Sequence, residues 1–169
     1  MFEIGDKIVY PIHGAGVIED IEEKSILGET REYYILKIPV NDMRVLVPKG
    51  SMDEVGVRPI MSPEEMDRVF DAMEDPELME MPKNWNRRYR FNQDIIKSGD
   101  LTQIAEVVKN LEALDGEKSL STGERKMLNV ARQIILSEMV LVYDKPYDEI
   151  ESLVGEALEK SIGGKGEEE

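Results

Sequence analysis

The spacing of apolar residues changes near residue 60. Before this point, short segments rich in Val, Ile and Tyr alternate in part between apolar and polar side chains, which is typical of β-strands. These segments are residues 7–11, 14–23, 31–39 and 43–48, and turn-forming residues at 13–14, 27–29, 41–42 and 48–50 separate them. The pattern predicts about four or five antiparallel strands in a small bent sheet or barrel. The segments do not alternate between strand and helix, so a parallel sheet is not expected.

After residue 60 the apolar residues recur at helical spacing, and each helix has a recognisable start. Ser62 and Ser121 are each followed three residues later by Glu, which predicts two capping boxes. Asn84 is the expected N-cap of a helix over 85–97 that stops at Gly99, and Asp100 with Gln103 starts the next helix. A first helix over 63–73 and a last helix from residue 146 complete the set.

Three of these helices have a continuous apolar face, which predicts a helical bundle. The expected inward-facing residues are Leu101, Ile104, Ala105, Val108 and Leu111 in one helix, Met127, Leu128, Ala131, Ile134, Ile135 and Met139 in the next, and Ile150, Val154 and Leu158 in the last.

The chain is therefore predicted to be an α+β protein of two modules. Residues 1–60 form the β-domain, 61–82 a helix and an acidic linker, 83–162 the helical domain, and 163–169 a disordered acidic tail. The Met-rich stretch over 66–81 is compatible with either a rigid helix or a flexible hinge.

Charge is distributed unevenly. The formal net charge of -15 argues against a nucleic-acid partner, because DNA binding needs Lys and Arg to neutralise phosphates. Residues 83–132, however, carry 10 basic and 7 acidic side chains, a net charge of +3. A polyanion responds to the local field, so this basic island is the candidate docking region.

The centre of the island is the segment over 83–90, which has four basic residues, no acidic residue and the chain's single Trp. Arg87, Arg88 and Arg90 at a helix start can contact phosphates. Trp85 can stack on a base or wedge into a base step. The alternative is that Trp85 and Tyr89, one turn apart, pack into the core while the arginines are solvated.

Two further segments have two interpretations each, one as part of a binding site and one as a purely structural element. Arg125, Lys126 and Arg132 extend the basic surface if their helix starts beside Trp85, and otherwise form an ordinary exposed face. The apolar segment over 43–48 follows a turn and ends in Pro, so it is either an exposed edge that accepts a partner's strand or a routine strand of the sheet.

Signals for catalysis are weak. The chain has no Cys and one His, His13, which lies in a turn-like Pro-Ile-His-Gly sequence without a second ligand. Gly14 and Gly16 lack the helix that follows a phosphate loop, and the carboxylate clusters fall on expected solvent faces. No segment has the roughly 18 consecutive apolar residues of a membrane span. We expect a cytoplasmic protein that is not an enzyme and uses no metal or cofactor.

Several of these segments together resemble the CarD/CdnL family of bacterial transcription regulators, over nearly the whole chain. The segments are GDKIVYPIHGAG, REYYILKI, MRVLVP, PKNWNRRYRFN, IKSGDLTQIAEVVKNL and LSTGERKMLNVARQIILSEM. The N-terminal part also resembles the polymerase-interacting module of transcription-repair coupling factors, but those proteins lack this helical partner.

The resemblance implies a Tudor-like domain that docks on the β subunit of RNA polymerase, and a helical domain that meets promoter DNA at the upstream edge of the bubble. It implies that Trp85 is the wedge that hinders bubble collapse. The implied phosphate-contacting residues are Arg87, Arg88, Arg90, Arg125 and Lys126. The implied polymerase-binding residues are Lys24, Ile26, Arg44 and Leu46, where some members have arginines in place of Lys24 and Leu46.

These observations favour a regulator that is tethered to polymerase and stabilises the open promoter complex. A protein–protein adapter without DNA contact is the first alternative, which burial of Trp85 would favour. A hydrolase that uses clustered carboxylates is the second, and it would need a concave acidic pocket.

Overall fold

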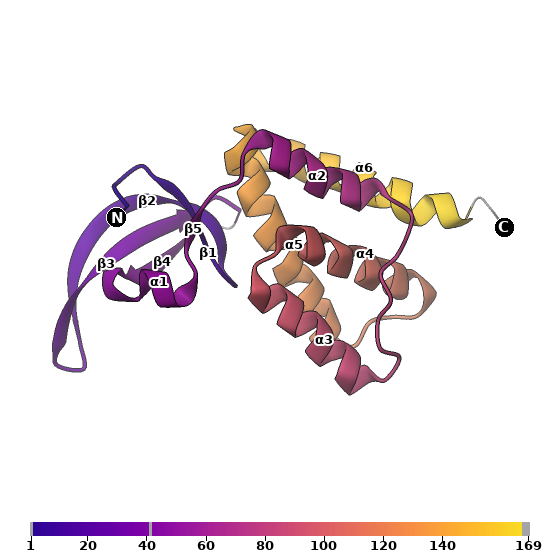
Figure 1. Cartoon of the computed structure of the whole chain (residues 1–169), viewed down its shortest axis with the longest axis horizontal. Helices are drawn as coiled ribbons and strands as arrows, with labels where there is room; N and C mark the ends of the chain where they lie inside the picture. The colour runs from indigo at the N-terminus through magenta and orange to yellow at the C-terminus, as the bar shows by residue number, and fades with distance from the viewer. Residues whose placement is uncertain (1, 41, 167–169) are drawn as a thin grey trace.

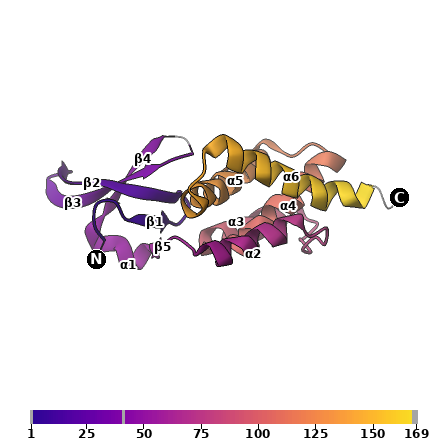
Figure 2. The ribbon, with the colours of Figure 1, turned by 90° about the horizontal axis from the view of Figure 1, so that it is seen from above.

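A computed structural model describes residues 2–40 and 42–166 as two adjoining lobes, an antiparallel sheet and a group of helices (Figure 1). This is the α+β architecture predicted from the sequence. Seen from above, the two lobes lie side by side along the long axis of the molecule, with α6 extending away from the sheet (Figure 2).

The sheet has five strands in the order β4-β3-β2-β1-β5, and every pair is antiparallel. The strands are β1 Lys7–Tyr10, β2 Gly14–Ile26, β3 Glu29–Ile38, β4 Met43–Pro48 and β5 Arg58–Pro59. Two short elements between β4 and β5 were not predicted, the 3-10 turn η1 Lys49–Ser51 and the helix α1 Met52–Val55. Within the described residues, β4 forms one edge of the sheet, as one of the two interpretations of its sequence proposed.

One face of the sheet is packed into a small core of Ile8, Ile18, Tyr34, Leu36 and Val47. The pairing of β2 with β3 shifts between Ile18 and Asp20, so Glu19 lies in a β-bulge. Gly16 permits the close approach of the strands, since a Cβ there would lie 2.5 Å from the carbonyl oxygen of Lys37.

The helices begin where their caps predict. They are α2 Pro63–Glu74, α3 Trp85–Ser98, α4 Leu101–Glu117, α5 Thr122–Tyr143 and α6 Tyr147–Gly166. Ser62, Asn84, Asp100 and Ser121 each accept a hydrogen bond from a backbone N–H of the first turn. No helix in the described part of the chain is long and apolar enough to span a membrane.

Two boundaries differ from the prediction. Met66, Val69 and Met73 of α2 belong to the same core as α4, α5 and α6, so the helical domain includes α2 and begins before residue 83. At the other end α6 continues to Gly166, so residues 163–166, which we predicted to be disordered, are helical. Residues 167–169 of the predicted tail lie outside the described residues.

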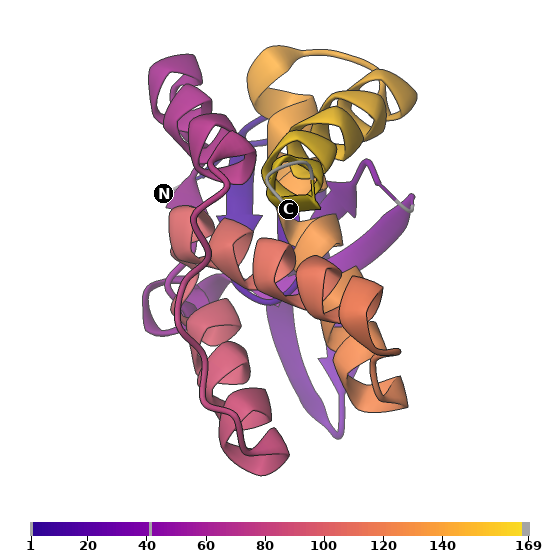
Figure 3. The same cartoon turned by 90° about the vertical axis from the view of Figure 1, so that its right-hand side faces the viewer.

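The linker between α2 and α3 is irregular, as predicted, and passes across α4 on its way to α3 (Figure 3). Two buried side chains of α4 bind it. The Lys109 ammonium donates to the carbonyl oxygens of Asp75 and Glu77, at 3.0 and 2.9 Å, and Asn110 donates to the carbonyl of Met79. These bonds satisfy backbone groups that no secondary structure satisfies. The stretch over 66–81 is therefore a helix up to Glu74 followed by an irregular segment that side chains of α4 bind through hydrogen bonds.

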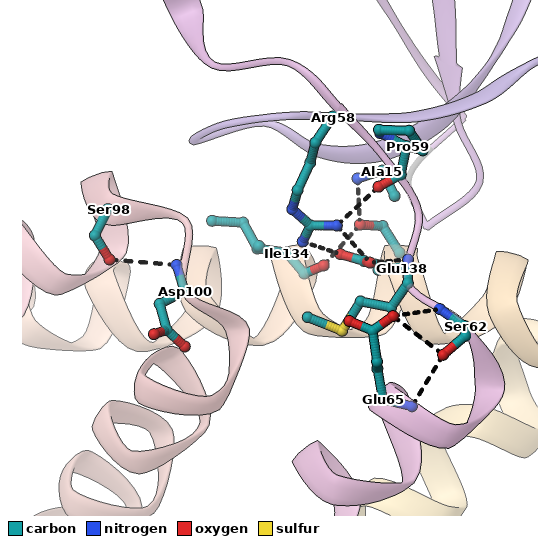
Figure 4. Close-up of polar contacts among 11 residues, drawn as sticks. Ala15, Arg58, Pro59, Ser62, Glu65, Ser98, Asp100, Ile134 and Glu138 are labelled. Carbon is teal, nitrogen blue, oxygen red and sulfur yellow. Dashed lines mark hydrogen bonds and ion pairs between the residues drawn. The ribbon is translucent and has the colours of Figure 1, made fainter.

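The two lobes meet in a polar contact centred on α5 (Figure 4). Arg58 donates to both carboxylate oxygens of the fully buried Glu138, at 2.9 and 2.7 Å, and the backbone N–H of Met61 donates to the same carboxylate. The N–H of Ala15 donates to the Ser137 hydroxyl at 2.9 Å. Because each carboxylate oxygen is paired, this contact fixes the orientation of the sheet against α5.

Candidate functional sites: a cationic helical surface and a sheet face

Trp85 is a surface residue at the start of α3. Its side chain is 42% exposed, and its ring stacks on Tyr89 with centroids 5.2 Å apart. The indole Nε1–H donates to the Ser121 hydroxyl at 3.1 Å. Tyr89 packs against the helical core while Trp85 lies outside it, so the interpretation in which both aromatic rings enter the core is wrong for Trp85.

The starts of α3 and α5 lie together at one end of the helical domain (Figure 1). The Trp85–Ser121 hydrogen bond joins them, and Arg88 joins them a second time through two hydrogen bonds to Glu124, at 2.8 and 3.0 Å. The two basic groups predicted from sequence therefore adjoin in space. Ser121 accepts both from the indole and from the N–H of Glu124, so one hydroxyl caps α5 and orients Trp85.

The Arg88 guanidinium forms an ion pair with Glu124. Glu124 is buried, with 2% of its surface exposed, and the hydrogen bond that the Arg88 guanidinium donates to Glu124 raises the pKa of that guanidinium. The predicted capping box at Ser121 is only half formed, because the backbone N–H of Ser121 does not donate to the Glu124 carboxylate, which accepts from Arg88 instead. A buried carboxylate needs such a partner.

Arg125 and Arg132 are paired in the same way. Arg125 donates to Asp115 at 2.9 Å, and Arg132 donates to Glu112 at 2.7 Å. The backbone N–H of Leu120 is the main reason that the pKa of Asp115 is lowered, with the Arg125 guanidinium second. Arg88 and Arg125 thus neutralise the carboxylates of Glu124 and Asp115.

Six other cations of this region have no described carboxylate within ion-pair distance, although the chain has 36 acidic residues. All six are exposed, and we call them the α3–α5 cationic surface: Lys83, Arg87, Arg90, Lys97, Lys118 and Lys126. Three of the predicted contact residues, Arg87, Arg90 and Lys126, belong to this surface. Lys118 was missed because it lies outside the segments that sequence patterns single out, and Lys97 was missed because its segment was noted for the family resemblance and not for its charge.

The second candidate site is one face of the sheet. In the register of the sheet, Leu46 lies opposite Ile35, and Ile35 lies opposite Asp20. Lys24 and Ile26 lie further along β2, each an even number of residues after Asp20. Because directly opposed residues share a face and every second residue returns to it, Lys24, Ile26, Arg44 and Leu46 lie on the same face. We call these four residues the β2–β4 face. Ile26 and Leu46 expose 46% and 41% of their surface.

The two cations of the β2–β4 face are paired. Arg44 donates to both carboxylate oxygens of Glu19 in the bulge, at 2.7 and 3.2 Å, and Lys24 lies 3.3 Å from Glu22. The hydrogen bond from Arg44 holds the pKa of the Glu19 carboxyl below its ordinary value. This face therefore presents exposed aliphatic side chains between neutralised charges.

The remaining candidates from sequence have structural roles. His13 stacks on Tyr10 with ring centroids 5.0 Å apart, and its N–H closes a turn onto the carbonyl of Tyr10. Gly14 has a φ of +103° and faces Ser137 so closely that a Cβ would lie 2.5 Å from its hydroxyl oxygen. Among the described residues, no group of three or more His, Cys, Asp or Glu side chains is placed to hold a metal ion.

Comparison with known proteins assigns this combination of a sheet and a helical lobe to one family. Residues 2–61 match the family model "CarD-like/TRCF RID domain", which is Tudor-like, and residues 68–155 match "CarD, C-terminal domain". The chain belongs to the CarD family of transcription factors. It is 38% identical over 145 residues to a Bacillus subtilis (strain 168) protein described as "Putative transcription factor YdeB", with 84% of this chain and 92% of that protein covered.

Proposed function

We propose that the protein binds the β subunit of RNA polymerase through the β2–β4 face and the upstream fork of the promoter bubble through Trp85 and the α3–α5 cationic surface, so that it stabilises the open complex. The single observation that carries the DNA half is the surface itself. Six exposed cations without a described carboxylate partner lie over α3, the end of α4 and the start of α5, the region that also holds an exposed indole, in a chain of net charge -15. Phosphates are the anions that such a surface attracts.

The polymerase half rests on the family and on the register. The four residues that the family resemblance nominated lie on one face, beside the edge strand β4. Exposed aliphatic side chains flanked by neutralised charges suit a protein partner better than a polyanion. Because Lys24 and Leu46 stand where some members have arginines, we infer a contact that depends less on salt.

The geometry divides the predicted DNA contacts into two groups. We assign phosphate contact to Arg87, Arg90 and Lys126, whose charges are free to act on DNA. We assign to Arg88 and Arg125 the neutralisation of Glu124 and Asp115, which would otherwise repel phosphates beside Trp85. The two residues support the surface without contacting the nucleic acid.

No catalytic step is needed for the proposed effect. A protein tethered to polymerase meets nearby DNA at high effective concentration, so a weak surface without sequence preference is sufficient. If it binds the melted promoter better than the closed promoter, the equilibrium shifts by that difference alone. A difference of about 1.4 kcal/mol changes the open-to-closed ratio tenfold.

Trp85→Ala tests this function. Stacking on Tyr89 and the hydrogen bond to Ser121 already orient the indole, so its insertion at a distorted base step needs little reordering. The inserted ring offsets part of the free-energy cost of unstacking the bases. The variant should bind polymerase normally but shorten the lifetime of open complexes challenged with a competitor, and Trp85→Phe should be intermediate. An unchanged lifetime for Trp85→Ala would support the adapter without DNA contact.

A further inference from the structure

A groove runs between α3 and α5 on the side of Tyr89 away from the start of α3. Ile96, Met127 and Val130 provide apolar walls, and Tyr89 and Gln93 complete the lining along α3. Its volume is about 220 Å³, below the roughly 300–1,000 Å³ of sites that take drug-sized ligands. The groove is thus suited to one ring system, not to a whole cofactor.

The rim of the groove is positively charged. Lys97 and Lys126 line it, both are exposed, and neither has a described carboxylate within ion-pair distance. An apolar and aromatic slot with an amide inside and two free cations at its edge matches an unpaired nucleotide, which has a flat apolar base, a polar base edge and a phosphate. A base within a duplex cannot enter the slot without leaving its stack.

Ile12, from the turn between β1 and β2, also lines the groove. Ile12 has a φ of +78°, which is rare for a β-branched residue, and its side chain is 51% exposed. Backbone in such a conformation is often found at ligand sites, where the surrounding structure holds it in place. Here it brings an apolar side chain of the sheet domain to the groove of the helical domain.

We propose that this groove binds one unpaired base of the melted promoter strand, next to the base step that Trp85 enters. Tyr89 connects the two positions, since it stacks on Trp85 and lines the groove. The proposal rests on the proposed function and deepens it, because a site that accepts only unpaired bases binds the open promoter and not the closed one.

The test compares three labelled probes by fluorescence anisotropy with the full-length protein at low salt. The first is a single strand of about 12 nucleotides, the second is an abasic strand with the same number of phosphates, and the third is a duplex. We expect the base-containing strand to bind at least about fivefold more tightly than the abasic strand. Val130→Phe fills the groove and should abolish this preference, whereas Val142→Phe, the same change elsewhere on α5, should retain it.

A second pair of variants avoids any effect of volume on folding. Gln93→Glu places a negative charge inside the groove at nearly constant size and should also abolish the preference, while Gln133→Glu on the exposed side of α5 should not. Equal binding of the two single strands by the unaltered protein, or a preference that survives Gln93→Glu and a folded Val130→Phe, overturns the groove assignment. If duplex binding and open-complex lifetime are normal in that case, the proposed function stands; if the protein binds none of the probes, both proposals are contradicted.

Discussion

The β-domain and the start of the helical domain differ in how many of their basic residues form ion pairs. Of the seven basic residues of the β-domain, all except the exposed Lys7 lie within ion-pair distance of a described carboxylate: Lys24, Arg31, Lys37, Arg44, Lys49 and Arg58. On the α3–α5 cationic surface six exposed cations lack such a partner among the described residues, and the pairs nearby hold Glu124 and Asp115. Net charge hides this difference, because a polyanion interacts with the local surface. The comparison teaches that pairing, more than composition, distinguishes the proposed polymerase-binding face from the proposed DNA-binding surface.

The strongest test of the distinction is Arg88→Ala against Arg87→Ala. Removing Arg88 leaves the buried Glu124 carboxylate unpaired, so we expect a loss of about 3 kcal/mol in the free energy of unfolding. Arg87 is exposed and unpaired, and its removal should change stability by less than about 0.5 kcal/mol. Urea denaturation of both variants measures the difference. Equal stabilities would show that Arg88 does not have the supporting role.

Leu46→Glu tests the β2–β4 face. A carboxylate at this exposed position leaves the fold intact but must be desolvated in the complex, which predicts at least about thirtyfold weaker binding to the polymerase β subunit, or about 2 kcal/mol. Copurification with the β subunit and titration of the purified proteins measure this loss. Lys7→Glu, a change of charge on β1, is the control that should bind normally. Normal binding by folded Leu46→Glu would remove this face from the proposal.

Reversing the charge of Arg87 and Arg90 together should weaken binding to duplex DNA about tenfold and reduce the dependence on salt, because fewer counterions are released. The reduction should be similar for unrelated sequences. Arg31→Glu with Arg44→Glu reverses the same number of charges in the β-domain and should leave DNA affinity unchanged. A loss of the same size in both double variants would mean that total charge controls binding.

Ser121→Ala removes one hydroxyl with two functions. The loss of the α5 N-cap should cost about 1 kcal/mol, and the loss of the Trp85 partner should shift the indole emission. Thermal unfolding and the Trp fluorescence of the folded protein separate the two effects. Unaltered emission would show that Ser121 does not orient the indole.

The smallest expected effect is on acid titration. The folded-state pKa values of Glu19 and Asp115 are lowered, so each contributes stability above its unfolded-state pKa that is lost as the pH falls through the folded-state value. Arg44→Gln should return the pKa of Glu19 to its ordinary range, because Arg44 is the main cause of the shift. Arg125→Gln should restore Asp115 only in part, because the Leu120 N–H remains. NMR titration of the carboxyl carbons gives both values, and full restoration of Asp115 would contradict this order of causes.

Local features of the fold were predictable, and contacts between distant residues were not. Ser62, Asn84, Asp100 and Ser121 cap helices as predicted, because capping depends on residues three positions apart. The partner of Glu124 is Arg88, 36 positions away, and no local pattern indicates that choice.

Two buried charged residues, Lys109 and Glu138, could have been used to predict buried polar contacts from the sequence. Lys109 and Glu138 each lie beside one other polar residue in mainly apolar stretches of their helices, and both are fully buried with partners in the linker and in β5. A charged residue inside an apolar face predicts a buried polar contact. The identity of its partner depends on the tertiary fold, so the fixed linker and the contact between the lobes could not be predicted from the sequence.

The proposal that one surface contacts DNA and the other contacts polymerase is tested most directly by photocrosslinking. A photocrosslinking amino acid is placed at position 87 or at position 46 of the full-length protein in open promoter complexes. The account predicts that position 87, on the α3–α5 cationic surface, crosslinks to promoter DNA at the upstream edge of the bubble. Position 46, on the β2–β4 face, should crosslink to the polymerase β subunit and not to DNA. Crosslinks from position 87 to protein alone, or from position 46 to DNA, would contradict it.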